Sequence, residues 1–421
     1  MVYLHCAVSF ACKIYYGLCR IATGFLPGSA KDGRKKGDSC MQIHKDVEGI
    51  FNDCQEIRHS LHRIPELGFE EFKTNKFILS VLERYPPDSV EVLAVTDIKA
   101  VYYAKGSAKT IAFRADIDAL KTDEVNDVPY KSRHEGKMHA CGHDGHATIL
   151  LLLAQLIHKN REKLVVNVVL LFQPAEEGRG GAYRMIADGA LKNPDVDRIY
   201  GMHLWPEVPK GKIGIRWGLM MAKTCEFDMT VRGISSHGAS PQHGVDAVVA
   251  SALLITALQT AITRNVDPHS GAVLTIGKIN GGVARNVIAD KVVMNATLRV
   301  FSQQAYDLLM GRISAMMDGI AVATGAEFEI FENLTFPCVD NPRHLVEDFY
   351  NYIDMSDVVL VDPVMAAEDF SCYQQEVPGI FMFLGAGGGK NSAPLHNEHF
   401  DFDEDALLYG VEVYRRLVLN G

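Results

Sequence analysis

Residues able to bind a metal or act in catalysis gather in the stretch MHACGHDGHAT, residues 138–148. Cys141 and His143 are two positions apart there, and thiolate with imidazole is a ligand pair that suits zinc, with manganese or cobalt as further candidates. The Cys-x-His pair does not decide the matter alone, because a lone histidine is usually a surface or hydrogen-bonded residue. Cys141 could instead be a nucleophile that attacks a carbonyl, with a nearby histidine as its base. The stretch alone therefore leaves a metal site and a cysteine nucleophile open.

More candidates follow four short apolar runs that predict β-strands. The runs lie in KTIAFRADIDAL (109–120), LVVNVVLLFQPAEEG (164–178), RIYGMHLW (198–205) and GIFMFLGAGGG (379–389), the third ending close to its histidine. The acids and histidines near or beyond the ends of these runs are Asp116, Asp118, Glu176, Glu177, His203 and His396. Ligands of open α/β sheets bind in the crevice at the carboxyl ends of the strands. We therefore expect these side chains to converge.

Such convergence would favour the metal over the nucleophile. A dinuclear hydrolytic centre needs several protein ligands, a bridging donor and a nearby carboxylate that is not itself a ligand. The adjacent Glu176 and Glu177 can supply one ligand and one such carboxylate. The nucleophile hypothesis, by contrast, leaves Glu177, His203 and His396 without a role.

The elements that must position these residues begin at His44, where strand-like and helix-like segments start to alternate as in an α/β domain. An opening helix is predicted over residues 46–64, ending before Pro65, which lacks the amide hydrogen that a helix interior needs. A second helix is predicted over residues 147–157, directly after the cysteine and histidine stretch. Cys141 would then lie at a helix amino terminus, where backbone amides stabilise a thiolate.

Residues 223–332 predict a different order of elements, β-α-β-β-α-β, which is the split βαβ or ferredoxin-like arrangement. We interpret them as a domain inserted into the first one. Residues 44–222 and 333–421 then form the α/β domain, and residues 1–43 an extension that takes no part in the chemistry. An unpaired strand edge in the insert would be a natural homodimer contact.

Composition excludes several other classes of protein. With 421 residues, 48% of them hydrophobic and 22% charged, the chain can bury a large core as a soluble globular protein. A net charge of -10 leaves no basic field for a phosphate backbone, so we expect no nucleic-acid partner. Lys13 and Arg20 interrupt the apolar start, so we expect no membrane partner either, although the lack of acids before Asp32 is compatible with organelle targeting. The nine cysteines are scattered, which favours a reducing compartment such as the cytoplasm.

Two stretches of the predicted insert could contact a substrate. SSHGASPQHG contains His237, and GGVARNVIAD contains Arg285 and Asn286. His237 could donate to a developing oxyanion, while Arg285 or Asn286 could hold a substrate carboxylate. Local sequence by itself favours a plainer interpretation, in which glycine, serine and proline mark turns and Arg285 forms a surface ion pair.

Eight motifs, taken in order, resemble those of the aminoacylase-type metal amidohydrolases. They are RADIDAL, MHACGHDGH, FQPAEEG, GMHLWP, SSHGASPQHGVDA, INGGVARNVIAD, AAEDFS and LHNEHFDFDEDAL, and the resemblance runs from about Ile50 to the end. Hippurate hydrolase, N-acyl-L-amino-acid amidohydrolases, N-acetyldiaminopimelate deacetylase and plant auxin-conjugate hydrolases belong to this group. The resemblance implies an α/β, metallopeptidase-like catalytic domain with a central mixed sheet flanked by helices. It also implies that the inserted ferredoxin-like domain serves as a lid and in dimerisation.

The resemblance further implies two divalent metal ions, Zn or Mn with Co as a further option, bridged by Cys141. His143 and His203 would complete the site of one ion. Glu177 and His396 would complete the site of the other.

The remaining roles implied by the resemblance are catalytic. Glu176 would be the general base, Asp116 a supporting catalytic group, and His237 a group near the oxyanion that is contributed across a dimer. The sequence departs from the family at Lys121, where a proline is common after D-A-L, so the shape of the substrate loop can differ.

Together these features predict metal-dependent hydrolysis of the amide bond of an N-acyl amino acid, for example an N-acetyl or N-benzoyl compound. The products would be a carboxylate and a free amino acid. The alternative within the same chemistry is a metallo-carboxypeptidase or dipeptidase that acts on short peptides. A non-catalytic binding protein is a further alternative, but it would have no use for an unligated base such as Glu176.

Overall fold

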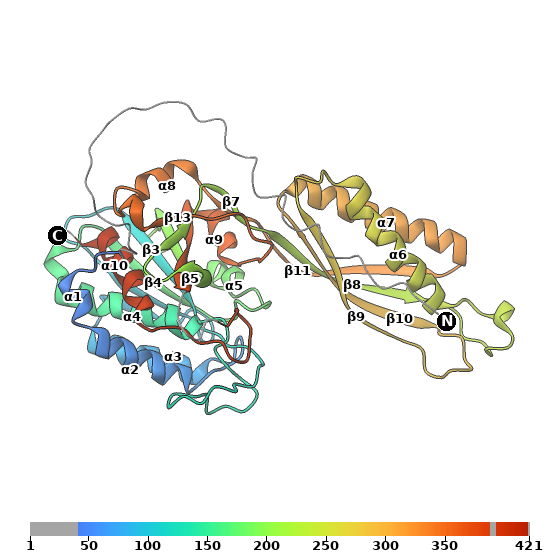
Figure 1. The fold of residues 1–421 in the computed structure, drawn as a ribbon, viewed down its shortest axis with the longest axis horizontal. Helices are drawn as coiled ribbons and strands as arrows, with labels where there is room; N and C mark the ends of the chain where they lie inside the picture. The colour runs from blue at the N-terminus through green and yellow to red at the C-terminus, as the bar shows by residue number, and fades with distance from the viewer. Residues whose placement is uncertain (1–40, 388–392, 420–421) are drawn as a thin grey trace, which may run out of the picture. The chain divides into compact units, whose positions relative to one another are not determined.

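The computed structural model describes residues 41–387 and 393–419. The N-terminal extension predicted over residues 1–43 therefore lies almost wholly outside the described residues, as does part of the glycine-rich loop after residue 387. These described residues fold into two larger sheets and one pair of short strands, with helices packed on the sheets (Figure 1).

The larger sheet has eight strands and is mixed. In spatial order they are β1 (Ser89–Glu91), β2 (Ile98–Tyr102), β4 (Asn167–Gln173), β3 (Thr110–Asp116), β5 (Arg198–Pro209), β14 (Gly379–Gly387), β6 (Ile213–Ile215) and β13 (Val358–Leu360). The four strands predicted to carry the site, β4, β3, β5 and β14, are consecutive neighbours and mutually parallel. Their carboxyl ends meet at one edge of the sheet, which confirms the predicted arrangement.

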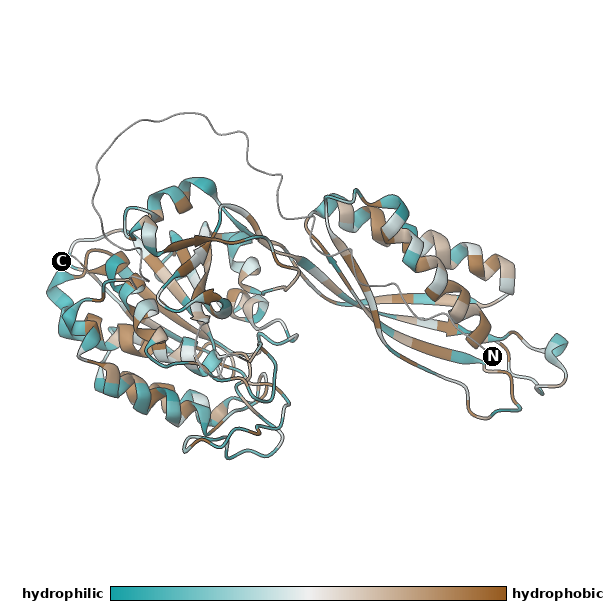
Figure 2. Ribbon diagram, in the orientation of Figure 1, coloured by the Kyte–Doolittle hydropathy of each residue, from teal (hydrophilic) through white to brown (hydrophobic). Residues whose placement is uncertain are grey.

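Helices cover both faces of this sheet. One face packs against α1 (Lys45–Glu48), α2 (Phe51–His62), α3 (Phe72–Arg84), α4 (His143–Lys159), α8 (Arg343–Phe349) and α10 (Ala406–Val418). The other face packs against α5 (Gly181–Ala187) and α9 (Phe370–Glu376). Both faces are buried, which is why the strands read as continuous apolar runs rather than as an alternating pattern. Figure 2 shows hydrophobic residues on these strands and mixed hydropathy on the surrounding helices.

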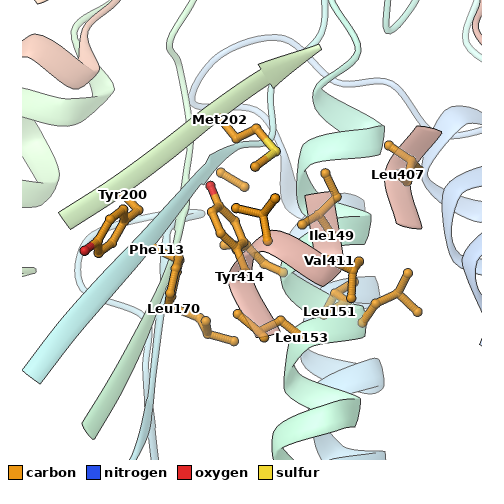
Figure 3. Close-up of a cluster of buried hydrophobic side chains, with 14 of the residues drawn as sticks. Phe113, Ile149, Leu151, Leu153, Leu170, Tyr200, Met202, Leu407, Val411 and Tyr414 are labelled. Carbon is orange, nitrogen blue, oxygen red and sulfur yellow. The ribbon is translucent and has the colours of Figure 1, made fainter. Parts of the chain in front are cut away.

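The core between α4, α10 and the sheet fixes the helix that begins at the candidate site. Successive strand residues point to opposite faces, so Phe113 belongs to this core while Ala112 belongs to the core under α5 and α9. Figure 3 shows Phe113 beside Tyr414 of α10, with Leu151 of α4 in the same cluster. The rings of Phe113 and Tyr414 have centroids 4.4 Å apart, within the range of favourable aromatic pairs.

The second sheet is four-stranded and antiparallel, in the spatial order β11 (Glu327–Phe336), β8 (Lys223–Arg232), β10 (Lys291–Val300) and β9 (Ala272–Gly281). With α6 (Ala247–Asn265) and α7 (Gln303–Thr324) it forms a separate hydrophobic core and shows the predicted β-α-β-β-α-β order. By length and composition α6 could cross a membrane, but Leu254 and Leu258 are fully buried in this core. The division of the chain into a catalytic domain and an inserted lid stays a prediction.

The remaining described elements are short. They are the paired strands β7 (Gly218–Met221) and β12 (Val339–Asn341), and the 3-10 helices η1 (Arg161–Lys163), η2 (Pro241–His243) and η3 (Met355–Asp357).

Two details of the predicted elements are wrong. The opening helix is not continuous but breaks into α1 and α2 at Gly49, as expected of the residue that, after proline, is least favourable in a helix. Strand β5 does not end near His203 but continues to Pro209, because β14 keeps pairing with it, past a register shift, up to Pro209. His203 therefore projects from the body of a strand rather than from a loop.

Candidate active site

The cysteine and histidine stretch folds into the amino terminus of α4. His143 is the first residue of the helix, and Gly142 before it has φ +87°, a left-handed conformation that favours glycine. A Cβ at Gly142 would also lie 2.9 Å from Leu204 Cδ1 of β5. Close packing of this turn on β5 brings Cys141 Sγ within 3.4 Å of His203 Nε2.

The loop that follows β14 delivers His396 to the same place. Its side chain lies with Nε2 3.2 Å from Cys141 Sγ and 3.3 Å from Glu177 Oε1. The His396 backbone, with φ +65°, donates its N–H to Ala140 O at 2.8 Å, which ties this loop to the turn before α4. His396 is exposed whereas Cys141 is buried, so the cluster is open to solvent on the His396 side.

The structure thus brings all five predicted metal ligands together, in two groups that share Cys141. The ligand atoms within each group lie within 4.8 Å of one another. The first group is Cys141, His143 and His203, and the second is Cys141, Glu177 and His396.

Hydrogen bonds around the buried histidines fit a metal. His143 Nδ1 lies 2.9 Å from the backbone oxygen of Asp118 and 3.2 Å from Asp118 Oδ1, so it must donate. His143 Nε2 is buried and hydrogen-bonds to no described residue, so this nitrogen is available to bind an ion. His203 Nδ1 likewise lies 2.7 Å from Leu204 O. Two imidazoles held at Nδ1 in this way, with one thiolate and one carboxylate, are a donor set suited to Zn, Mn or Co.

The charge environment of Cys141 differs from the sequence-based expectation. Burial, and next the carboxylates of Glu177 and Glu176, raise the pKa of the Cys141 thiol well above its ordinary value. A cation bound in the cluster would reverse this rise in the pKa, since a coordinating thiol is deprotonated outright. The protein alone does not activate this cysteine as a nucleophile.

Glu176 lies between the candidate ligands and a second set of buried acids. It groups with His143 and Glu177 on one side and with Glu368 and Asp369 on the other. Burial, and then the charge of Glu368, raise the pKa of Glu176 well above its ordinary value. A carboxyl group with a raised pKa can exchange protons near neutral pH, as a general base must.

Buried Arg114 holds the acids behind Glu176. Its guanidinium lies 2.7 Å from Asp116 Oδ2, 3.0 Å from Glu368 Oε1 and 2.6 Å from Asp369 Oδ1. Arg114 lies on β3 and Asp369 precedes α9. The network therefore fixes the ends of elements that are far apart in sequence.

Asp116 supports the cluster through His146. Its Oδ1 lies 2.6 Å from His146 Nδ1, and His146 Nε2 accepts the Leu204 N–H at 2.9 Å. This chain of hydrogen bonds links β3, α4 and the strand that carries His203. Asp116 Oδ2 approaches His143 Nε2 only to 3.7 Å.

Two other polar residues of the stretch face away from the candidate ligands. Asp144 Oδ2 lies 3.1 Å from Arg58 Nε and 2.8 Å from His62 Nδ1. His139 is buried, and burial lowers its pKa to about 3, so it is neutral. Both residues belong to the packing of α2 against the helix start.

The three candidates for substrate contact, His237, Arg285 and Asn286, lie close together in segments that connect the elements of the four-stranded sheet. His237 and Val287 form an isolated antiparallel bridge, and Gly238 N donates to Asn286 O at 2.8 Å. His237, Arg285 and Asn286 are all exposed. Among the described residues, no hydrogen bond or ion pair joins them to the cysteine and histidine cluster, so their roles stay predictions.

Sequence reasoning assigned no role to several residues that shape the site. Asp118 orients His143 and accepts the Glu177 N–H at 3.0 Å. The spacing of Asp116 and Asp118 on one strand end was a usable signal, since residues two apart share a face. Glu368 and Asp369 occur in the motif AAEDFS, where adjacent acids before a helix signal a helix start rather than a catalytic site.

Comparison with known proteins defines the class. Residues 112–420 match the model of peptidase family M20/M25/M40. The chain is 37% identical over 362 residues to the N-acetyldiaminopimelate deacetylase of Bacillus subtilis (strain 168), covering 85% of this chain and 95% of that protein. It is 36% identical over 411 residues to IAA-amino acid hydrolase ILR1-like 2 of Arabidopsis thaliana, covering 94% and 90%. A solved dinuclear metal-binding peptidase of the M20 family from Bacillus subtilis matches with a TM-score of 0.75 at 29% identity, covering 88% and 98%.

The chain therefore belongs to peptidase family M20/M25/M40, which confirms the resemblance inferred from the motifs. It is an enzyme that hydrolyses amide bonds. The mixed central sheet flanked by helices agrees with the fold of the solved relative.

Proposed function

We propose that this enzyme hydrolyses the amide bond of N-acyl amino acids, using two divalent metal ions, Zn or Mn with Co as a further option. The observation that carries the proposal is the arrangement of two ligand groups that share Cys141, with Glu176 beside them. The relatives support the choice of substrate, because one is named as a deacetylase of an acetylated amino acid and another as a hydrolase of an amino-acid conjugate.

In this proposal Cys141, His143 and His203 hold one ion, and Cys141, Glu177 and His396 hold the other. Bound there, the ions supply Lewis-acid activation of water and of the acyl carbonyl. Glu176 removes a proton from the attacking water at its carboxylate and returns it to the departing amine nitrogen. Asp116 supports this machinery through its hydrogen bond to His146.

Three residues of the predicted inserted domain complete the proposal. His237, contributed across a homodimer, donates to the tetrahedral oxyanion, and Arg285 with Asn286 grips the free carboxylate of the substrate. The dimer contact would lie on the four-stranded sheet or its helices, and sedimentation at micromolar concentration that gives a monomer would contradict it. No nucleic acid or membrane is involved in this proposal, and a cytoplasmic location stays a prediction.

The test is Glu176→Gln, with Glu207→Gln on the exposed part of β5 as the matched control. We expect Glu176→Gln to keep the metal content of the wild type and lose turnover by several orders of magnitude, because the amide cannot accept the proton. Near-normal hydrolysis by this variant would end the assignment.

A substrate panel separates the proposal from its alternative. N-acetyl and N-benzoyl amino acids are compared with dipeptides under identical metal loading. Higher kcat/KM for dipeptides would show a metallo-carboxypeptidase or dipeptidase instead.

A further inference from the structure

The turn that carries Glu176 is strained at the residue before it. Strand β4 ends at Gln173, and Ala175 then adopts φ +58°, which is left-handed. L-amino acids, unlike glycine, disfavour this conformation because Cβ approaches the following carbonyl oxygen. Ala175 is fully buried and has no polar side chain that could compensate. Such a conformation persists only when its surroundings enforce it.

Glu71 supplies the contact that holds this backbone. Ala175 donates its N–H to Glu71 Oε1 at 3.0 Å, while the Ala175 carbonyl accepts the Gly181 N–H at 3.1 Å. The second oxygen of Glu71 accepts the hydroxyl of Thr96 at 2.7 Å. Both oxygens of the carboxyl group are therefore used, one for the turn and one for the segment before β2.

The chain around Glu71 packs directly on the same turn. A Cβ added to Gly68 would lie 2.9 Å from both Cα and Cβ of Ala175, so only glycine allows this approach. Arg179, beyond Glu177 in the turn, donates from Nη1 to Gly68 O at 2.9 Å. The segment from Gly68 to Glu71 and the turn from Ala175 to Arg179 are thus joined at three points.

Burying the carboxyl group of Glu71 costs free energy, and filling space in the core does not require a carboxyl group. The side chain is fully buried, it forms no ion pair among the described residues, and burial raises its pKa to about 7. An apolar side chain would fill the same space without this penalty. The contribution particular to Glu71 therefore comes from its hydrogen bonds, among them those to Ala175 and Thr96.

We propose that Glu71 is a positioning residue for the reaction, holding Ala175 in its left-handed conformation and thereby aiming the Glu176 carboxylate. The inference rests on the proposed function, in which Glu176 is the base. Glu177 has a separate anchor, since its own N–H donates to Asp118 Oδ2 at 3.0 Å. Loss of the Glu71 contact should therefore disturb Glu176 more than Glu177, and turnover more than metal binding.

The experiment measures kcat, KM and metal content for Glu71→Ala, Glu71→Gln and Thr96→Val in the full-length enzyme. For Glu71→Ala we expect kcat to fall by roughly 10- to 100-fold with metal content unchanged, since small misplacements of a catalytic group have effects of this size. Glu71→Gln should keep kcat within about threefold, because its amide oxygen can accept the Ala175 N–H while its NH2 group donates to Thr96.

Thr96→Val is the matched control for a merely structural role. It removes the other hydrogen bond of Glu71 and leaves the one to Ala175 in place. We expect a loss of thermal stability like that of Glu71→Ala but a kcat close to that of the wild type. Equal losses of kcat in the two variants, or a Glu71→Gln enzyme as slow as Glu71→Ala, would overturn the proposal.

A second pair of variants tests the backbone directly. Glycine adopts the left-handed conformation without strain, so Ala175→Gly in the Glu71→Ala background should recover part of the lost kcat. If Glu71→Ala does not fold, Glu71→Asp takes its place in the test. Its shorter side chain retains the carboxyl group but moves the acceptor oxygen away from the Ala175 N–H. A wild-type kcat in Glu71→Asp would refute the inference as clearly.

The outcome also separates this inference from the proposed function. If Glu176→Gln keeps its activity, Glu176 is not the general base, and the proposed function fails whatever the effect of Glu71. If Glu176→Gln is inactive and Glu71→Ala is fully active, the assignment of Glu176 stands and only the positioning role of Glu71 is refuted.

Discussion

Replacing Asp118 by alanine should weaken metal binding without unfolding the enzyme. Asp118 is buried beneath the cluster, where its Oδ2 accepts the Glu177 N–H and its Oδ1 lies 3.2 Å from His143 Nδ1. It thus fixes one predicted ligand of each ion. Groups of this kind typically change metal affinity by about 10- to 100-fold when removed.

The expected loss lies at the lower end of that range, because one of the two linkages survives the substitution. His143 Nδ1 also lies 2.9 Å from the backbone oxygen of Asp118, which alanine retains, so the histidine keeps its tautomer. Glu177 loses the partner of its N–H, and an unsatisfied buried donor costs about 1–3 kcal/mol. We expect affinity to fall about tenfold, equivalent to about 1.4 kcal/mol, chiefly for the ion held by Glu177 and His396.

Competition with a chromophoric chelator measures both stepwise affinities. The controls are Asp123→Ala, an exposed carboxylate of the following loop, and Asp118→Asn, which keeps one acceptor oxygen and should fall between alanine and the wild type. Affinities within twofold of the wild type for Asp118→Ala would refute the reasoning. A loss beyond about 1000-fold for either ion would show that Asp118 is itself a ligand rather than a group that orients ligands.

Three further predictions concern the nucleophile, the packing and the pH dependence of stability. Cys141→Ser should lose bound metal together with activity, whereas full metal occupancy and a trappable acyl intermediate in the wild type would instead support a cysteine nucleophile. Gly410→Ala should lower the free energy of unfolding by about 1–3 kcal/mol, because its Cβ would lie 2.8 Å from Ile149 Cδ1. Gly311→Ala in α7, with open space around its Cβ, should raise that free energy by about 0.5–1 kcal/mol, and chemical denaturation compares the two. The pKa of Glu71 is raised to about 7 from an ordinary 4.5, so the folded state favours the protonated acid. The wild type should therefore lose up to about 3 kcal/mol of stability relative to Glu71→Gln as the pH rises from about 4.5 through 7. Unfolding at pH 5 and pH 8 measures this difference, and a constant or opposite difference would contradict it.

The strands and the convergence at their ends were predictable because they depend on local signals. Each buried strand reads as an apolar run, and β4 stops at Pro174 as expected of a residue without an amide hydrogen. The rule that parallel strands present their ligands at one edge then connected Cys141 with side chains as distant as His396. Family motifs supplied what the rule could not, namely which of these residues should share an ion.

The contacts that hold the site could not be predicted in the same way. Glu71 meets Ala175 across 104 positions, and Arg114 meets Asp369 across 255. Periodicity describes which face of an element is apolar, but not which distant polar atom lies opposite. The pKa of Cys141 shows the same limit, since the local helix terminus was visible in the sequence while the burial and the carboxylates that oppose it were not.

Charge balance gives a further argument for the proposed metal ions. Among the residues that the structure describes, the guanidinium of Arg114 pairs with three of the carboxylates there, and the imidazole of His143 lies near Asp116, Asp118 and Glu177. The acids gathered around Arg114 and around Cys141 are Asp116, Asp118, Glu176, Glu177, Glu368 and Asp369. Buried charges of one sign are stable only when paired, and the raised pKa of Glu176 and of the Cys141 thiol shows that the protein alone leaves them poorly paired. Two divalent cations between these ligands would supply the missing charge, so metal loading should stabilise the fold as well as the reaction, and the unfolding midpoint should rise with metal concentration.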